Sequence, residues 1–87
     1  MHTFMVVCTF KPDTVMEEVT AMAPEEMAQA KALRDEGLLS MVRVSVPRDK
    51  VFLEVSAPDS AGVIDVVERL PMSRWWDLDV YQIAAPV

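Results

Sequence analysis

The sequence predicts an α+β domain whose elements follow the order β-α-β-β-α-β. Three observations predict it. The chain has only 87 residues, which is enough for one small domain. Segments rich in β-branched and aromatic residues alternate with segments in which apolar residues recur every three or four positions. Two of the strand-like segments are joined by a short polar turn. No linker or repeat divides residues 1–87, so we expect a single domain.

The first strand is predicted at residues 3–10, which are apolar in both alternating sets. A helix follows, because Thr14 and Glu17 have the spacing of a capping box and Gly37 supplies a left-handed stop. Its predicted buried stripe consists of Met16, Val19, Ala23, Met27, Ala30 and Leu33. Pro24 interrupts this stripe, so we expect either a kink or a break into two helices there.

The middle of the chain predicts a hairpin and a second helix. Residues 38–46 and 51–56 are expected to pair as antiparallel strands around the turn at residues 47–50. Asp59 is placed to cap a helix that ends at Pro71.

The last strand is predicted at residues 76–83, which alternate apolar and polar. Two right-handed crossovers joined by a hairpin give a four-stranded antiparallel sheet with both helices on one face, the ferredoxin-like arrangement. The first three strands are apolar at both phases, so we expect the other face to be apolar as well. A second copy packed sheet against sheet would cover it, which predicts a homodimer in the form of a dimeric α+β barrel, or a higher oligomer.

Composition excludes several classes of function. Fourteen acidic and eight basic residues give a formal net charge of −6, which repels nucleic acid and anionic membrane surfaces. One cysteine and one histidine give no metal-ligand spacing, and no cofactor motif is present, so we expect neither metal nor cofactor. Without a signal-peptide pattern or an apolar run of roughly 20 residues, a soluble cytoplasmic protein is expected.

Arg43 and Glu54 are the first candidate site residues. A turn centred on residues 48 and 49 places them directly opposite each other. They form either a cross-strand ion pair or a substrate-binding arginine beside a carboxylate, desolvated under a helix, that moves protons. His2 lies at the start of the first strand, and histidine is a common acid–base residue. It is either a further catalytic candidate or an idle residue near the terminus.

A second cluster lies at the last strand. As adjacent strand residues, Trp75 and Trp76 would point to opposite faces, one toward a pocket and one toward the subunit contact. Core packing is the alternative for both. Asp77 shares a face with Asp79 and Tyr81, which brings two like carboxylates close together. Asp77 is therefore a candidate catalytic residue, and Trp75, Trp76 and Tyr81 are candidates for substrate binding. Solvated aspartates on an edge strand are the alternative.

Residues 70–80, Leu-Pro-Met-Ser-Arg-Trp-Trp-Asp-Leu-Asp-Val, resemble the muconolactone isomerase family. There a Leu-Pro pair is followed, after three residues, by an aromatic residue and then x-Asp-aliphatic-acid-Val. The similarity includes Glu36-Gly37 and Pro58 and covers about residues 25–83. It implies a dimeric α+β barrel, in some members a decamer, that uses no cofactor. It also implies the reaction, a proton shift that moves the double bond of an unsaturated lactone acid.

Residues 38–43 depart from that family, which is richer there in histidine, tryptophan and arginine, and Arg43 is displaced by one position. We therefore expect a more apolar pocket and a larger substrate, such as an aromatic or polyketide-like intermediate of secondary metabolism. The first hypothesis is a cofactor-independent isomerase, or a cyclase, acting on a small-molecule carbonyl compound. The alternatives are a non-catalytic small-molecule-binding module and a cofactor-free monooxygenase of the related dimeric-barrel group.

Overall fold

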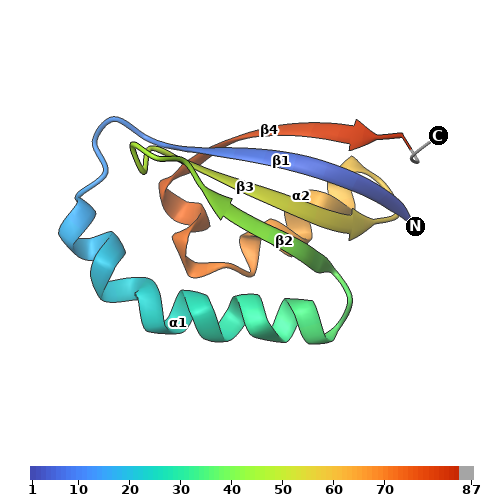
Figure 1. Ribbon diagram of the computed structural model, residues 1–87, viewed down its shortest axis with the longest axis horizontal. Helices are drawn as coiled ribbons and strands as arrows, with labels where there is room; N and C mark the ends of the chain where they lie inside the picture. The colour runs from blue at the N-terminus through green and yellow to red at the C-terminus, as the bar shows by residue number, and fades with distance from the viewer. Residues whose placement is uncertain (85–87) are drawn as a thin grey trace.

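The computed structural model describes residues 1–84, so residues 85–87 of the predicted domain lie outside it. Its elements are β1 (His2–Phe10), α1 (Met16–Asp35), β2 (Leu39–Val44), β3 (Lys50–Ala57), α2 (Ser60–Glu68), the short 3-10 helix η1 (Pro71–Trp75) and β4 (Trp76–Ile83). The strands form one antiparallel sheet in the order β2-β3-β1-β4. Both helices pack on the same side of it (Figure 1). The predicted α+β arrangement is confirmed and is consistent with a ferredoxin-like fold.

The core fills the space between the sheet and the two helices. Alternate residues of β1 and β3 point into it, as their alternating burial shows. They meet Leu33 of α1 and the inward face of α2. The largest fully buried side chains of this core include those of Phe4, Val6, Leu53, Val55, Val63, Val67 and Leu70.

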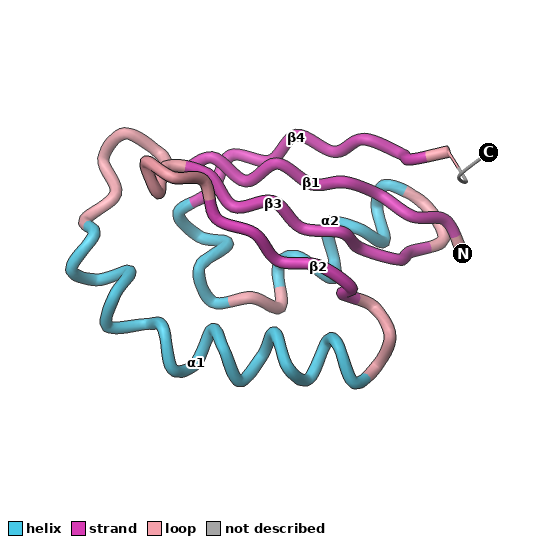
Figure 2. The backbone as a smooth tube through the Cα atoms, viewed as in Figure 1, coloured by secondary structure: helices cyan, strands magenta, loops and turns pink. Residues whose placement is uncertain are grey.

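α1 differs from the predicted helix at its start and in its middle. It begins after Val15, which makes no side-chain capping bond. The backbone N–H of Thr14 donates to the carbonyl oxygen of Lys11 over 3.0 Å, in a turn that precedes the helix. The predicted capping box is therefore wrong. Pro24 does not break the helix: α1 continues across it, and its first turns run at an angle to the rest (Figure 2). Of the two alternatives for Pro24, the kink is therefore the one observed.

The inward face of α1 also differs from the predicted stripe. Met27 is 72% exposed and Met16 is 47% exposed, so neither belongs to the core. Because an α-helix repeats every 3.6 residues, either residue 26 or residue 27 can follow Ala23 on one face. The apolar pattern predicted Met27, whereas Glu26 is the half-buried residue. The buried or half-buried residues of this face are Val19, Ala23, Glu26, Ala30 and Leu33.

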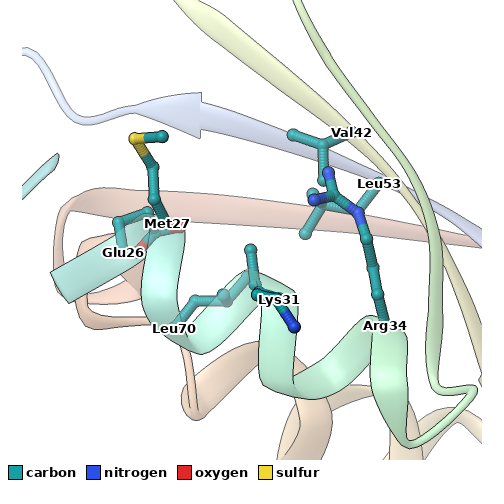
Figure 3. Close-up of a pocket in the computed structure, with 8 residues that line it drawn as sticks. Glu26, Met27, Lys31, Arg34, Val42, Leu53 and Leu70 are labelled. Carbon is teal, nitrogen blue, oxygen red and sulfur yellow. The ribbon is translucent and has the colours of Figure 1, made fainter. Parts of the chain in front are cut away.

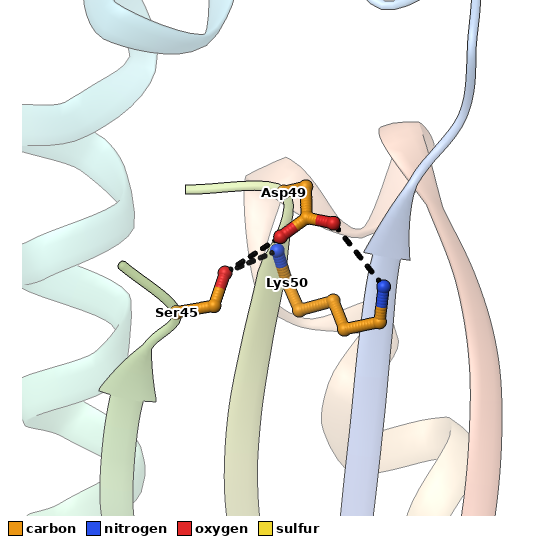
Figure 4. A network of polar contacts seen from close by, with 3 residues as sticks. All are labelled: Ser45, Asp49 and Lys50. Carbon is orange, nitrogen blue, oxygen red and sulfur yellow. Dashed lines mark hydrogen bonds and ion pairs between the residues drawn. The ribbon is translucent and has the colours of Figure 1, made fainter. Parts of the chain in front are cut away.

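The β2–β3 hairpin turns one residue earlier than the sequence predicts. The backbone N–H of Ser45 donates to the carbonyl oxygen of Lys50 over 2.9 Å, and Arg48 takes a left-handed φ of 62°. Asp49 accepts a 2.8 Å hydrogen bond from the Ser45 hydroxyl and lies 3.2 Å from Lys50 Nζ (Figure 4). These contacts stabilise the turn and determine the register of both strands.

The register changes the cross-strand partners of two predicted site residues. Arg43 lies opposite Phe52, and Glu54 lies opposite Met41. The predicted pairing of Arg43 with Glu54 is wrong, because moving the turn by one residue moves every pair by two positions. A shift of two keeps each side chain on its face. Both residues therefore share the sheet face that points away from the helices, and Glu54 is not desolvated under a helix.

The second half of the chain follows the prediction closely, with one added element. Asp59 caps α2 as predicted, accepting the backbone N–H of Gly62 over 2.8 Å. The helix ends at Glu68, and η1 then leads into β4. Trp75 belongs to η1, so the prediction that Trp75 and Trp76 are adjacent strand residues is wrong. No periodic pattern in the sequence indicates η1, because a single 3-10 turn is too short to show one.

Neither helix covers the outer face of the sheet. Val7 and Phe52, which are cross-strand partners, form the apolar centre of this face. Charged side chains stand at its two edges, Asp77 and Asp79 on β4 and Arg43 on β2. The outer face also carries Glu54 on the central strand β3, and the apolar residues Met41 and Ile83 on its edge strands. It therefore mixes apolar and charged side chains, whereas the sequence predicts an apolar face.

Candidate functional site

Four of the predicted site residues lie on the outer face of the sheet: Arg43, Glu54, Asp77 and Tyr81. The carboxylate of Glu54 accepts a 2.8 Å hydrogen bond from the Ser40 hydroxyl, and Arg43 Nη1 donates to a neighbouring backbone carbonyl oxygen. No ion pair joins Arg43 and Glu54 in residues 1–84. The expected cross-strand ion pair is therefore not formed.

The other three predicted residues are dispersed. His2 is exposed at the start of β1. Trp76 is buried and packs edge-on against Phe10, with ring centroids 6.1 Å apart. Trp75 is half-buried, and the Arg74 guanidinium stands 5.4 Å from the centre of its ring. Trp76 therefore packs in the core, which was the alternative to a role in substrate binding. None of the seven predicted residues lines either of the two cavities described next.

A cavity of about 550 Å³ lies between the second half of α1 and the inward face of β2 and β3 (Figure 3). Its volume falls in the range of roughly 300–1,000 Å³ that small-molecule sites occupy. Ala30 faces this space from α1 with only a methyl group. The lining is mostly apolar and consists of Glu26, Met27, Ala30, Lys31, Arg34, Val42, Leu53 and Leu70.

Glu26 places a carboxyl group in the wall of this cavity. Its Oε1 accepts the backbone N–H of Met72 over 2.9 Å, which ties α1 to η1. Burial raises the pKa of Glu26, and the hydrogen bond from Met72 opposes part of that rise. Burial, and then the charge of Glu26, also raise the pKa of the Cys8 thiol to about 12. A carboxyl group with a raised pKa in an apolar cavity is suited to both giving and taking a proton.

Two cationic side chains stand at the edge of the cavity. Lys31 Nζ lies 2.9 Å from Asp35, in an exposed pair one helical turn apart. Arg34 forms no ion pair with any residue of the described part of the chain. Figure 3 shows its side chain extended toward Val42 and Leu53. Its guanidinium is thus available to an anionic group on a ligand.

A second cavity of about 320 Å³ lies beside the first half of α1. Met72, whose backbone N–H binds Glu26, belongs to its wall, so this hydrogen bond stands between the two cavities. The lining consists of Phe10, Met16, Val19, Thr20, Ala23, Val44, Arg48, Val51 and Met72.

Sequence reasoning missed Glu26, although a signal was present. The acidic residues after Pro24 suggest a solvated first turn of a helix, and Glu25 is indeed exposed. Glu26, however, follows Ala23 by three positions and precedes Ala30 by four. A charged residue at a core spacing indicates either a structural hydrogen bond or a functional group.

Comparison with known proteins assigns no family: the chain matches no protein-family model and no curated protein. Within residues 1–84, no three or more histidine, cysteine or acidic side chains gather closely enough to hold a metal ion. Neither described helix has the length and apolar character needed to cross a membrane.

Proposed function

We propose that the protein is a cofactor-independent isomerase that moves a proton on an unsaturated lactone or related carbonyl metabolite. The observation that carries the proposal is the carboxyl group of Glu26 in the wall of a mostly apolar cavity. Glu26 would remove a proton beside the substrate carbonyl and return it at another carbon. Arg34, at the edge of the same cavity, would bind a substrate carboxylate or the charge that develops on an enolate oxygen.

The assignment of roles differs from the one that the sequence suggested. Glu54 and Asp77 lie on the outer face of the sheet, and the cavity lies on the other face. We therefore give the proton transfer to Glu26, with Glu54 and Asp77 as the alternatives that the experiment compares. The resemblance of residues 25–83 to muconolactone isomerases supports the same class of reaction.

A non-catalytic binding module is the second candidate, and one observation favours it. One carboxylate oxygen of Glu26 already accepts the backbone N–H of Met72, a contact that joins α1 to η1. A carboxyl group kept for that contact would be structural, and the cavity would then bind a small molecule without changing it.

We also propose that the outer face is covered by a second copy, giving a dimeric barrel. One row of cross-strand neighbours reads Asp79, Val7, Phe52 and Arg43 from β4 to β2. A two-fold axis parallel to the strands would place Arg43 against the partner subunit's Asp79 and Phe52 against the partner subunit's Val7. The row is thus complementary to its own copy in charge and in apolar contact, as a symmetric interface requires.

The isomerase proposal is tested by following muconolactone and related unsaturated lactone acids in deuterated water by proton NMR. The wild-type protein is expected to exchange the acidic proton and move the double bond. Glu26→Gln should lower the exchange rate about 100-fold or more, because the amide cannot shuttle a proton but still accepts the Met72 N–H. Glu25→Gln removes the same charge from an exposed position on the same helix and should keep the wild-type rate.

Full exchange by Glu26→Gln would overturn the role of Glu26, and Glu54→Gln and Asp77→Asn would then be measured in the same assay. Binding without exchange in the wild-type protein would identify a binding module. Oxygen consumption during the reaction would identify a monooxygenase.

A further inference from the structure

The two cavities follow one another along α1, between this helix and the sheet. Val42 and Val44 are successive inward residues of β2, and the first lines the larger cavity while the second lines the smaller. Leu53 and Val51 of β3 divide in the same way. The second half of α1 covers the larger cavity and its first half covers the smaller. We name the two cavities together the α1 groove. Its lining on α1 extends from Met16 to Arg34, about 27 Å of helix.

The α1 groove is apolar, and its walls are partly open to water. Met16 and Val44 line the smaller cavity, yet they are 47% and 52% exposed. Ala23 and Ala30 face the groove from α1 and leave space that longer side chains would fill. Covering such walls with hydrocarbon removes apolar surface from water, which favours binding.

An arginine stands at each end of the groove. Arg34, at the end of the larger cavity, has no ion-pair partner among residues 1–84. Arg48, at the other end, likewise forms no ion pair there and takes a left-handed φ of 62° in the hairpin turn. Figure 3 shows the Arg34 side chain extended toward Val42 and Leu53, which line the larger cavity. An acidic group is therefore bound more favourably beside Arg34.

We propose that the α1 groove binds one elongated amphipathic carboxylic acid, with its carboxylate at Arg34 and its hydrocarbon chain extending past Glu26 into the smaller cavity. The two cavities together remain within the volume range of small-molecule sites. The inference rests on the proposed function in one respect: the middle of the ligand passes the carboxyl group that moves the proton.

The first test is a chain-length series measured by titration calorimetry with hexanoate, decanoate and tetradecanoate, below the concentrations at which they form micelles. Affinity is expected to rise along the series, by up to about fourfold for each added methylene group. An affinity that stops rising at hexanoate would overturn the proposal, because the smaller cavity would then take no part in binding.

The second test blocks the smaller cavity from α1. Ala23→Phe should reduce tetradecanoate affinity at least tenfold and leave hexanoate affinity within twofold of wild type. Ala21→Phe, an exposed position on the same helix, should change neither. Ala23→Leu should act in the same direction to a smaller extent and covers the case in which the phenylalanine variant does not fold. Equal losses for both acids, or a change in oligomer mass on light scattering, would contradict the proposal.

The third test separates the two ends of the groove. Arg34→Gln should weaken decanoate about tenfold and leave decanol unchanged, whereas Arg48→Gln should leave both unchanged. A loss of decanoate affinity only in Arg48→Gln would overturn the orientation and, with it, the proposal.

Failure of this inference and failure of the isomerase proposal give different results. Chain-length dependence is measured by calorimetry and proton exchange by NMR, both on the wild-type protein. Tight binding of long acids without proton exchange would leave the groove assignment standing and remove the isomerase. Proton exchange on short lactone acids, with an affinity for fatty acids that does not rise with chain length, would support the isomerase and remove the groove assignment.

Discussion

Glu26 combines two properties that oppose each other in an ordinary core residue. Its carboxyl group is half-buried among apolar side chains, which disfavours the ionised form. The backbone N–H of Met72 satisfies one of its oxygens and partly offsets that effect. The side chain therefore keeps a place inside the fold together with a raised pKa, and that raised pKa makes stability depend on pH.

We expect the free energy of unfolding to depend on pH through the protonation of Glu26. Below its ordinary pKa of 4.5, the carboxyl group is protonated in both folded and unfolded chains and has no effect. Above that pH the unfolded chain ionises first, so stability falls until the pH passes the raised pKa of the folded chain. Urea denaturation from pH 4 to pH 8 should show Glu26→Gln gaining stability relative to wild type as the pH rises.

Glu25→Gln is the matched control, because it removes an exposed carboxylate next in the chain. The wild-type protein and Glu26→Gln share the lowered pKa values of Glu36 and Asp49, so those contributions cancel in the comparison. A difference between wild type and Glu26→Gln that stays constant with pH would show that burial does not perturb this carboxyl group.

Among the elements, those with local signals were predicted best. The cap of α2 needs only Asp59 and the backbone N–H three residues later, and it formed as predicted. The predicted start of α1 required Thr14 to be the N-cap residue. Thr14 instead belongs to a turn that precedes the helix, which begins after Val15. The hairpin register depends on a turn in which Arg48 takes a left-handed φ. Arginine is not typical of that conformation, as glycine is, so the sequence did not indicate where the turn closes.

We expect Asp59→Ala to lower the free energy of unfolding by about 1 kcal/mol, the usual effect of losing a side-chain cap. The backbone N–H of Gly62 would lose its partner at the first turn of α2. Asp65→Ala removes the same charge from an exposed position in the same helix and should change stability by less than about 0.5 kcal/mol. Equal effects of the two substitutions in urea denaturation would show that the loss of charge, and not the cap, is responsible.

For the molecule as a whole, the main feature is the outer face of the sheet, which neither helix covers. Its apolar centre at Val7 and Phe52 is flanked by acidic residues at one edge and by Arg43 at the other. A chain of this length buries a modest fraction of its surface, so an uncovered sheet face is a large part of what remains. A symmetric dimer covers that face without any further element.

We expect the protein to run as a dimer in light scattering and Val7→Arg to run as a monomer, because the new charge would be buried unpaired at the centre of the interface. Val46→Arg makes the same change at the tip of the hairpin, where the side chain is almost fully exposed, and should remain dimeric.

Charge reversal tests the orientation of the dimer. Arg43→Asp and Asp79→Arg should each weaken association, and the double variant should restore it, since the proposed pair is exchanged intact. A wild-type monomer would overturn the dimer, and a double variant weaker than both single variants would overturn the orientation.

The sequence by itself determined the order of the elements, the single antiparallel sheet, the cap of α2 and the boundaries of the last strand. These follow from local periodicity, turn residues and side-chain-to-backbone bonds between near neighbours. Only the tertiary structure decided the partners of Arg43 and Glu54, the place of Trp75, and the half-buried position of Glu26 beside two cavities. Those features depend on where a turn closes and on which of two adjacent helix positions faces the sheet. A change of one residue at either point alters the contacts while leaving the local pattern almost the same.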